Sequence, residues 1–307
     1  MEQRSIAVVF PGQGTQKPGM GAPWRAHDAW RVVARAEDAL GEPLAPLLLD
    51  ASAEDLGPTR HAQLAVLLTS LLAWEATRDT IPEPVAYAGH SLGQVTALVA
   101  SGALPFDEGV RFTARRGEAT QAAADANPGR MAALVGATIE QAQRACEAAP
   151  DECWLANDNA PGQVVIAGTP DGLDRASEHA RELGVRRVVA LDVAGAFHTP
   201  LLRDASDTLR AELESVALRD TNRPIVSNHD AVPYTDAKGW RERLADHVVV
   251  PVRWRDSQET LTGLGATTFV EVGHGATLAG LAKRTVPDVA VVGVATPADL
   301  EQLEGGS

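Results

Sequence analysis

The sequence is poor in cysteine and in long apolar runs. Cys146 and Cys153 are the only cysteines among 307 residues, too few for a disulfide framework or a four-cysteine zinc site, and this scarcity predicts a cytoplasmic protein. The longest apolar stretch, residues 64–74, is interrupted by Thr69 and Ser70 and is much shorter than the ~20 residues that cross a bilayer. We therefore expect no membrane span and interpret residues 64–74 as part of a buried helix.

Positive charge is also in short supply. Lys and Arg total 27 against 41 Asp and Glu, a net charge of −14, which argues against nucleic acid or an anionic membrane as the main partner. Only three of the 27 cationic residues are lysine and the other 24 are arginine, whose planar fork suits carboxylates and phosphates. The length fits one large domain or two smaller ones.

The middle of the chain has an element order of its own. After the breaker Asn127-Pro128-Gly129, the pattern predicts strands at 131–135, 154–157, 164–167 and 185–193, with helices after the N-caps Thr138 and Thr169. This β-α-β-β-α-β order is typical of a ferredoxin-like unit. We therefore expect an α/β protein in which a small ferredoxin-like domain, residues 128–194, is inserted into a large domain made of residues 1–127 and 195–307.

Gly89-His-Ser-Leu-Gly93 matches the nucleophile-elbow pattern G-x-S-x-G. A strand-like run at 85–88 precedes it and helical spacing follows, which indicates that Ser91 lies in a sharp strand-to-helix turn with its hydroxyl exposed. The alternative interpretation is a serine that caps a helix after a glycine turn.

A serine nucleophile needs a base nearby. Of the eight histidines, His198 follows the apolar residues 188–193 and precedes Thr199-Pro200. This second strand-to-helix junction predicts a base at the same sheet edge as Ser91, although a capping or core histidine fits the local sequence equally well.

Nine motifs in order along the chain carry a resemblance to a known family. They are Phe10-Pro-Gly-Gln-Gly-Thr-Gln16, Gly89-His-Ser-Leu-Gly93, Arg115-Arg-Gly117, Met131-Ala-Ala, Asn159-Ala-Pro-Gly-Gln-Val-Val-Ile-Ala-Gly168, Gly195-Ala-Phe-His198, Ser227-Asn228, Pro251-Val-Arg-Trp254, and Glu271-Val-Gly273 with Gly280-Leu-Ala-Lys-Arg284. Together they resemble the malonyl-CoA:acyl carrier protein transacylases, a family that includes free-standing acyltransferases of fatty acid and polyketide synthesis. The resemblance implies an α/β-hydrolase-like large domain.

The resemblance also implies a ping-pong reaction. An acyl group moves from a coenzyme A thioester to a serine, and then to the phosphopantetheine thiol of an acyl carrier protein, without a metal or other cofactor. The implied roles are nucleophile for Ser91, base and then acid for His198, oxyanion-hole N–H groups for Gln13 and Leu92, carboxylate binding for Arg116, and a base-orienting backbone carbonyl for His247. From the residues alone, Arg115 and Arg116 would be read as a solvated helix face.

Substrate choice is less clearly marked. Phe197 resembles a residue that opposes an α-methyl group, although a core phenylalanine is an equal alternative. Thr120 replaces a common Met, which suggests an enlarged pocket and an alternative function, transfer of a larger acyl group between two carrier proteins. Retention of Arg116 favours malonyl over that alternative, and favours transfer over a thioester hydrolase. Gln63 and Asn159 match positions that line the family's cleft.

The net charge of −14 would repel an acidic carrier protein electrostatically. We therefore expect a localised basic docking face near the cleft. Its candidate residues are Arg130, Arg186, Arg187, Lys283 and Arg284.

Overall fold

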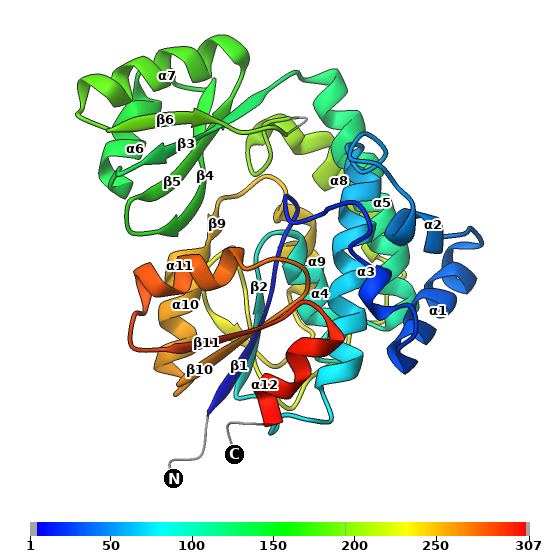
Figure 1. Cartoon of the computed structure of the whole chain (residues 1–307). Coiled ribbons are helices and arrows are strands. Elements are labelled where there is room, and N and C mark those ends of the chain that lie inside the picture. Colours follow the sequence, from blue (N-terminus) through cyan, green and yellow to red (C-terminus); the bar gives the residue numbers. More distant parts are fainter. Residues whose placement is uncertain (1–4, 194, 305–307) are drawn as a thin grey trace.

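The computed structural model describes residues 5–193 and 195–304, which form two sheets with helices around them (Figure 1). The larger sheet has six strands in the order β11-β10-β1-β2-β7-β8, all parallel except the β7–β8 pair. Its strands are β1 (Ile6–Phe10), β2 (Ala86–Gly89), β7 (Ile225–Val226), β8 (Pro233–Tyr234), β10 (Thr268–Val272) and β11 (Ala290–Val294). The central strands β1 and β10 are buried along their whole length, as expected for a parallel sheet covered on both faces.

The smaller sheet has five strands in the order β6-β3-β5-β4-β9. They are β3 (Arg130–Val135), β4 (Cys153–Ala160), β5 (Gln163–Gly168), β6 (Arg187–Ala190) and β9 (Val252–Arg253). The first four pair in antiparallel fashion, and β9 adds a short parallel pairing from a distant part of the chain.

Helices surround the two sheets (Figure 1). The α-helices are α1 (Arg31–Leu40), α2 (Ala45–Leu49), α3 (Thr59–Thr77), α4 (Leu92–Ala100), α5 (Phe106–Ala126), α6 (Ile139–Glu147), α7 (Pro170–Glu182), α8 (Arg203–Leu213), α9 (Trp240–Asp246), α10 (Trp254–Gly263), α11 (Thr277–Thr285) and α12 (Glu301–Glu304). The 3-10 helices are η1 (Ala22–Trp24), η2 (Asp28–Trp30), η3 (Pro200–Leu202) and η4 (Pro297–Leu300). Across the described ranges, none of these helices combines the length and hydropathy that a membrane-spanning segment needs.

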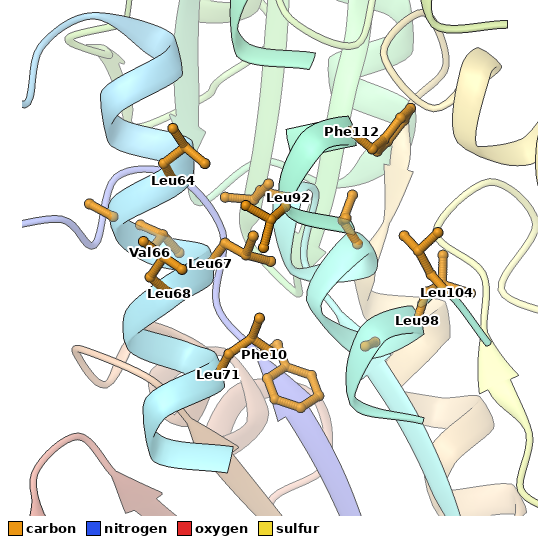
Figure 2. Packing of buried hydrophobic residues seen from close by; sticks show 14 of the residues in the cluster. Phe10, Leu64, Val66, Leu67, Leu68, Leu71, Leu92, Leu98, Leu104 and Phe112 are labelled. Carbon is orange, nitrogen blue, oxygen red and sulfur yellow. The ribbon is translucent and has the colours of Figure 1, made fainter. Parts of the chain in front are cut away.

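The apolar residues 64–74 lie in helix α3, which is buried on nearly all sides. Its side chains pack against those of β1 and α4, so that Phe10, Leu67 and Leu92 meet in one cluster (Figure 2). Burial of each large aliphatic side chain contributes about 1.5–3 kcal/mol. The buried-helix interpretation is confirmed, and this core fixes α4, whose first residue follows Ser91.

The predicted β-α-β-β-α-β order is observed as β3-α6-β4-β5-α7-β6. Thr138 and Gln141 form a reciprocal capping box at the start of α6, and the Thr169 hydroxyl accepts a hydrogen bond from the Gly172 N–H at 3.1 Å at the start of α7. A separate apolar core lies between this sheet and its two helices. This core supports our proposal of a small domain at 128–194. The upper boundary, residue 194, lies outside the described residues.

Candidate active site

Ser91 lies in a tight turn between β2 and α4 that only small flanking residues permit. A Cβ atom on Gly89 would lie 1.9 Å from the Gly93 carbonyl oxygen, and one on Gly93 would lie 2.1 Å from the Phe10 carbonyl oxygen. The turn holds Ser91 at φ 50° and ψ −110°, a conformation that is costly for a residue with a side chain. The predicted strand-to-helix junction is confirmed.

Ser91 and His198 are 107 residues apart in sequence, and their reactive atoms are in contact. Ser91 Oγ lies 2.8 Å from His198 Nε2, while His198 Nδ1 lies 2.8 Å from the His247 carbonyl oxygen. Because a carbonyl oxygen only accepts, Nδ1 carries the proton and Nε2 presents its lone pair to the serine hydroxyl. The arrangement is that of a serine and its general base, oriented by a backbone carbonyl.

His198 reaches this position by a route that the sequence argument missed. We expected a strand-to-helix junction on the sheet edge that carries Ser91, but the preceding strand, β6, is the edge strand of the smaller sheet. His198 lies in the connection from β6 back to η3, at φ 63°, and its N–H donates to the Val248 carbonyl at 3.0 Å. The prediction of a shared sheet edge was therefore wrong, because the connection between the two sheets, and not a strand end, positions the base.

Two backbone N–H groups beside Ser91 have no acceptor among the described residues. They belong to Gln13, in the turn after β1, and to Leu92, at the first position of α4. The first N–H groups of a helix lack intrahelical partners and carry partial positive charge. These two groups are suited to stabilising an oxyanion that forms at a carbonyl attached to Ser91.

Arg116 brings a positive charge into the site. It extends from α5, is 2 % exposed, and its Nη2 donates to Ser91 Oγ at 3.3 Å. Burial alone lowers its pKa to about 10, with no carboxylate in the described ranges offsetting that effect. Its neighbour Arg115 is exposed and pairs with Glu118 and Glu212 on the surface. A buried guanidinium without a counter-ion creates a strong preference for an anionic ligand.

The same burial keeps the base neutral. Desolvation, with the nearby Arg116 charge as the second cause, lowers the pKa of His198 to about 3. His198 is therefore unprotonated at pH 7 and ready to accept the serine proton. Burial also lowers the pKa of His90, whose Nε2 lies 2.7 Å from Asn159 Oδ1.

These side chains surround a cavity of about 150 Å³. Residues from both sides of the proposed domain boundaries contribute to it. The lining residues are Gln13, His90, Ser91, Arg116, Met131, Asn157, Asn159, Val165, Leu191, Val193, Phe197 and His198. From the sequence we assigned no role to His90, Met131, Asn157, Val165, Leu191 or Val193. His90, Met131 and Val165 lie in quoted motifs, whereas Asn157, Leu191 and Val193 lie in predicted strands without a motif that marks them as cavity residues.

Two of the expected substrate-binding residues do not line the cavity. Thr120 is fully buried in α5, where its hydroxyl donates to the Arg116 carbonyl at 2.7 Å. Gln63 is fully buried in α3 and its Nε2 donates to Gln13 Oε1 at 3.3 Å. Neither side chain lines the cavity, so a contact of Thr120 or Gln63 with the substrate, and a pocket enlarged by Thr120, stay predictions.

Helix α11, which carries the basic candidates Lys283 and Arg284, lies beside one end of the smaller sheet (Figure 1). Arg284 of α11 donates to the Pro161 carbonyl at 2.7 Å and to Gln163 Oε1 at 2.8 Å, and the Arg186 side chain packs over Gly136 at the end of β3. Arg187 and Lys283 are exposed next to them. Arg130 differs, since it forms an ion pair with Asp174 at 2.7 Å.

In the described part of the chain, no group of three or more His, Cys, Asp or Glu side chains is arranged to hold a metal ion.

The sequence and fold match known acyltransferases over nearly their full length. A family model described as "Acyl transferase domain" matches residues 7–302. The malonyl CoA-acyl carrier protein transacylase of Bacillus subtilis is 37% identical over 301 residues, covering 96% of this chain and 95% of its own length. The crystal structure of an acyl carrier protein S-malonyltransferase from Vibrio cholerae superimposes with a TM-score of 0.93 at 34% identity, covering 97% of this chain and 99% of its own. A malonyl-transacylase in complex with its type II polyketide synthase acyl-carrier protein matches with a TM-score of 0.94 at 33% identity, covering 98% of this chain and 100% of its own.

Proposed function

Because the chain belongs to the acyl transferase family of the malonyl CoA-acyl carrier protein transacylases, we propose that it transfers a malonyl group from malonyl-CoA to the phosphopantetheine thiol of an acyl carrier protein. The observation that carries this proposal is the pairing of Ser91 Oγ with His198 Nε2, at 2.8 Å, beside the buried and uncompensated Arg116. The pair supplies a nucleophile for a thioester, and the arginine supplies a partner for the free carboxylate of malonate.

In the first half-reaction, His198 Nε2 takes the proton of Ser91 while Oγ attacks the thioester carbonyl. The oxyanion that forms is held by the N–H groups of Gln13 and Leu92. When the carbon–sulfur bond breaks, His198 returns the proton to the departing coenzyme A thiolate. The second half-reaction repeats these steps in reverse, with the carrier's thiol as nucleophile and Ser91 as the leaving group.

Arg116 is suited to binding the malonyl carboxylate through two parallel N–H donors. Fixing the far end of the short diacid positions its thioester end at Ser91. The uncompensated positive charge supports malonyl over a long neutral acyl group, and supports transfer over hydrolysis because the bound carboxylate keeps the acyl group in place. Phe197, which also lines the cavity, is placed to oppose a substituent on the α-carbon.

For carrier docking we propose a basic face made of Arg186, Arg187, Lys283 and Arg284. Arg130 is left out because the Asp174 carboxylate, at 2.7 Å, already compensates its charge. An acidic carrier approaching this face meets uncompensated guanidinium and ammonium groups, although the net charge of the whole chain is −14. A cytoplasmic location, expected from the sequence, stays a prediction.

Intact-mass spectrometry tests the proposal directly. Incubation with malonyl-CoA is expected to add one malonyl group, which Ser91→Ala abolishes, and addition of an acyl carrier protein carrying its phosphopantetheine arm is expected to move that group to the carrier. A stable adduct that the carrier never removes, or an adduct that water removes as fast as the carrier does, would contradict a transferase.

A further inference from the structure

Asn228 directs both ends of its side-chain amide to the residues around Ser91. This residue, 1 % exposed, follows β7. Its Oδ1 accepts from the Ser91 N–H at 2.9 Å, and its Nδ2 donates to the Gly89 carbonyl at 2.8 Å. Its backbone N–H donates to Gln94 Oε1 at 2.9 Å, and its carbonyl accepts from the Arg253 N–H at 3.0 Å. Asn228 therefore joins both sides of the strained turn.

These partners fix which way the Asn228 amide points. The Gly89 carbonyl only accepts and the Ser91 N–H only donates, so the amide oxygen must face Ser91. The ring of His247 lies against that same oxygen, with Nε2 at 3.1 Å. His247 Nε2 therefore carries the proton, and its Nδ1, which has no hydrogen-bond partner within the described ranges, does not.

His247 is consequently linked to both halves of the catalytic pair, to His198 directly and to Ser91 through Asn228. Its backbone carbonyl accepts from His198 Nδ1 at 2.8 Å, and its ring donates to the Asn228 oxygen that also receives the Ser91 N–H. The ring is 2 % exposed and burial keeps it neutral by lowering its pKa well below the usual value. Ser91 is held at φ 50°, and a strained backbone persists only where its surroundings hold it.

We propose that Asn228 and the ring of His247 are positioning residues. Asn228 holds the backbone of Ser91 in the conformation that points Oγ at His198, and the His247 ring, as the Nε2–H tautomer, locks the Asn228 amide in place. The proposal deepens the function proposed above and rests on it. Neither side chain lines the cavity, so both act through Ser91 and not on the substrate.

Two substitutions at His247 isolate the ring, because every variant keeps the backbone carbonyl that orients His198. His247→Leu removes the donor, whereas His247→Gln supplies an amide N–H of similar reach. We expect His247→Leu to lower kcat on the order of 10- to 100-fold with little change in KM for malonyl-CoA, since misplacing a reacting group by a fraction of an ångström costs rates of this size. His247→Gln is expected to restore most of the loss.

Labelling of Ser91 by a fluorophosphonate separates this proposal from the proposed function, because the probe needs an aligned Ser91–His198 pair but no malonyl site. The labelling rate is expected to fall and recover with kcat in the two variants. Wild-type protein that labels rapidly but accepts no malonyl would contradict the proposed function, while the variants' labelling rates would still decide the role of the ring.

Equal kcat and labelling rates in the wild type and His247→Leu would overturn the proposal. Equal losses of these rates in His247→Leu and His247→Gln would overturn it as well. A measurement on the wild type keeps it falsifiable if the leucine variant does not fold. Nitrogen-15 NMR of the histidine rings at pH 7 is expected to show a proton on Nε2 of His247, and a ring protonated on Nδ1 instead would also overturn the proposal.

Discussion

Replacing Arg116 by methionine is expected to reverse the preference of the enzyme for an anionic acyl group. Arg116→Met keeps an unbranched apolar stem of similar length and removes the charge. The guanidinium is 2 % exposed, so a malonyl carboxylate bound there is withdrawn from water. Loss of one partner from such a buried pair costs about 3–5 kcal/mol, and each 1.36 kcal/mol is worth tenfold in rate. We therefore expect kcat/KM for acylation by malonyl-CoA to fall roughly 10²- to 10⁴-fold.

Acetyl-CoA, which has a methyl group where malonyl-CoA has its carboxylate, supplies the internal comparison. In the wild type it leaves the Arg116 guanidinium desolvated without a partner, and in Arg116→Met that penalty is gone. The loss of the Arg116 charge also raises the pKa of His198, since that charge is the second cause of its lowering after burial. Acetylation of Ser91 is expected to stay constant or to rise, so the malonyl-to-acetyl ratio falls by the full factor.

Single-turnover acylation, followed by intact mass with each thioester, measures both rates. Arg115→Met is the matched control, because it removes the same charge from the next residue of α5, where Arg115 is exposed and pairs with Glu118 and Glu212; both rates are expected to remain near wild type. Equal losses for malonyl and acetyl in Arg116→Met would refute the reasoning. That result would assign the arginine's effect to its 3.3 Å contact with Ser91 Oγ and not to a carboxylate.

Four further expectations follow from the structure. The pKa of His198, lowered to about 3, predicts that fluorophosphonate labelling of Ser91 continues down to about pH 4, and a rate that halves near pH 6.5 would contradict it. Between about pH 6.5 and 3 the unfolded chain binds a proton at His198 that the folded chain excludes, so the stability of the fold is expected to fall as pH drops through that range. The thermal unfolding temperature should therefore fall less between pH 7.5 and 5.5 in His198→Gln than in the wild type. An equal fall in both would count against the lowered pKa of His198. Gly93→Ala places a Cβ 2.1 Å from the Phe10 carbonyl oxygen and is expected to cost at least about 3 kcal/mol of unfolding free energy in urea titration, whereas near-wild-type stability would show that the turn relaxes. Arg187→Glu is expected to raise KM for the carrier several-fold and to leave the rate of acylation by malonyl-CoA unchanged. Arg219→Glu, an equal charge change at an exposed arginine beside Ala103, is the control and is expected to alter neither quantity. Equal effects of the two substitutions would indicate that the carrier responds to the net charge of the chain and not to a docking face.

Much of the site was predictable because its chemistry lies in short, local patterns. A Cβ atom at position 89 or 93 would lie within 2.2 Å of a backbone oxygen, so both positions require glycine. The turn around Ser91 can therefore be recognised from its sequence motif. The capping residue Thr138 and the buried run in α3 are also set by interactions within a few residues along the chain. Local sequence patterns of this kind gave the β-α-β-β-α-β order of the small domain.

Local sequence patterns did not predict the role of a side chain where that role depends on its tertiary contacts. Thr120 was expected in the acyl pocket, but its hydroxyl donates to the Arg116 carbonyl one turn earlier in α5, and no local pattern indicates that bond. A rotation of one residue around the same helix separates the buried Arg116 from the exposed Arg115. Asn228 stood in a quoted motif without a role, since its partners Ser91 and Gly89 lie more than 130 residues away in sequence.

The sequence by itself determined the order of the elements, the position of the nucleophile and the resemblance to one acyltransferase family. These follow from hydrophobic period, turn chemistry and motifs, which act over a few neighbouring residues. Only the tertiary structure decided that His198 reaches Ser91 from the connection between two sheets, that Arg116 is buried without a counter-ion among the described residues, and that His247 bonds to His198 directly and to Ser91 through Asn228. Those properties come from long-range packing and desolvation, because a proton's position and a charge's cost depend on every group that surrounds them.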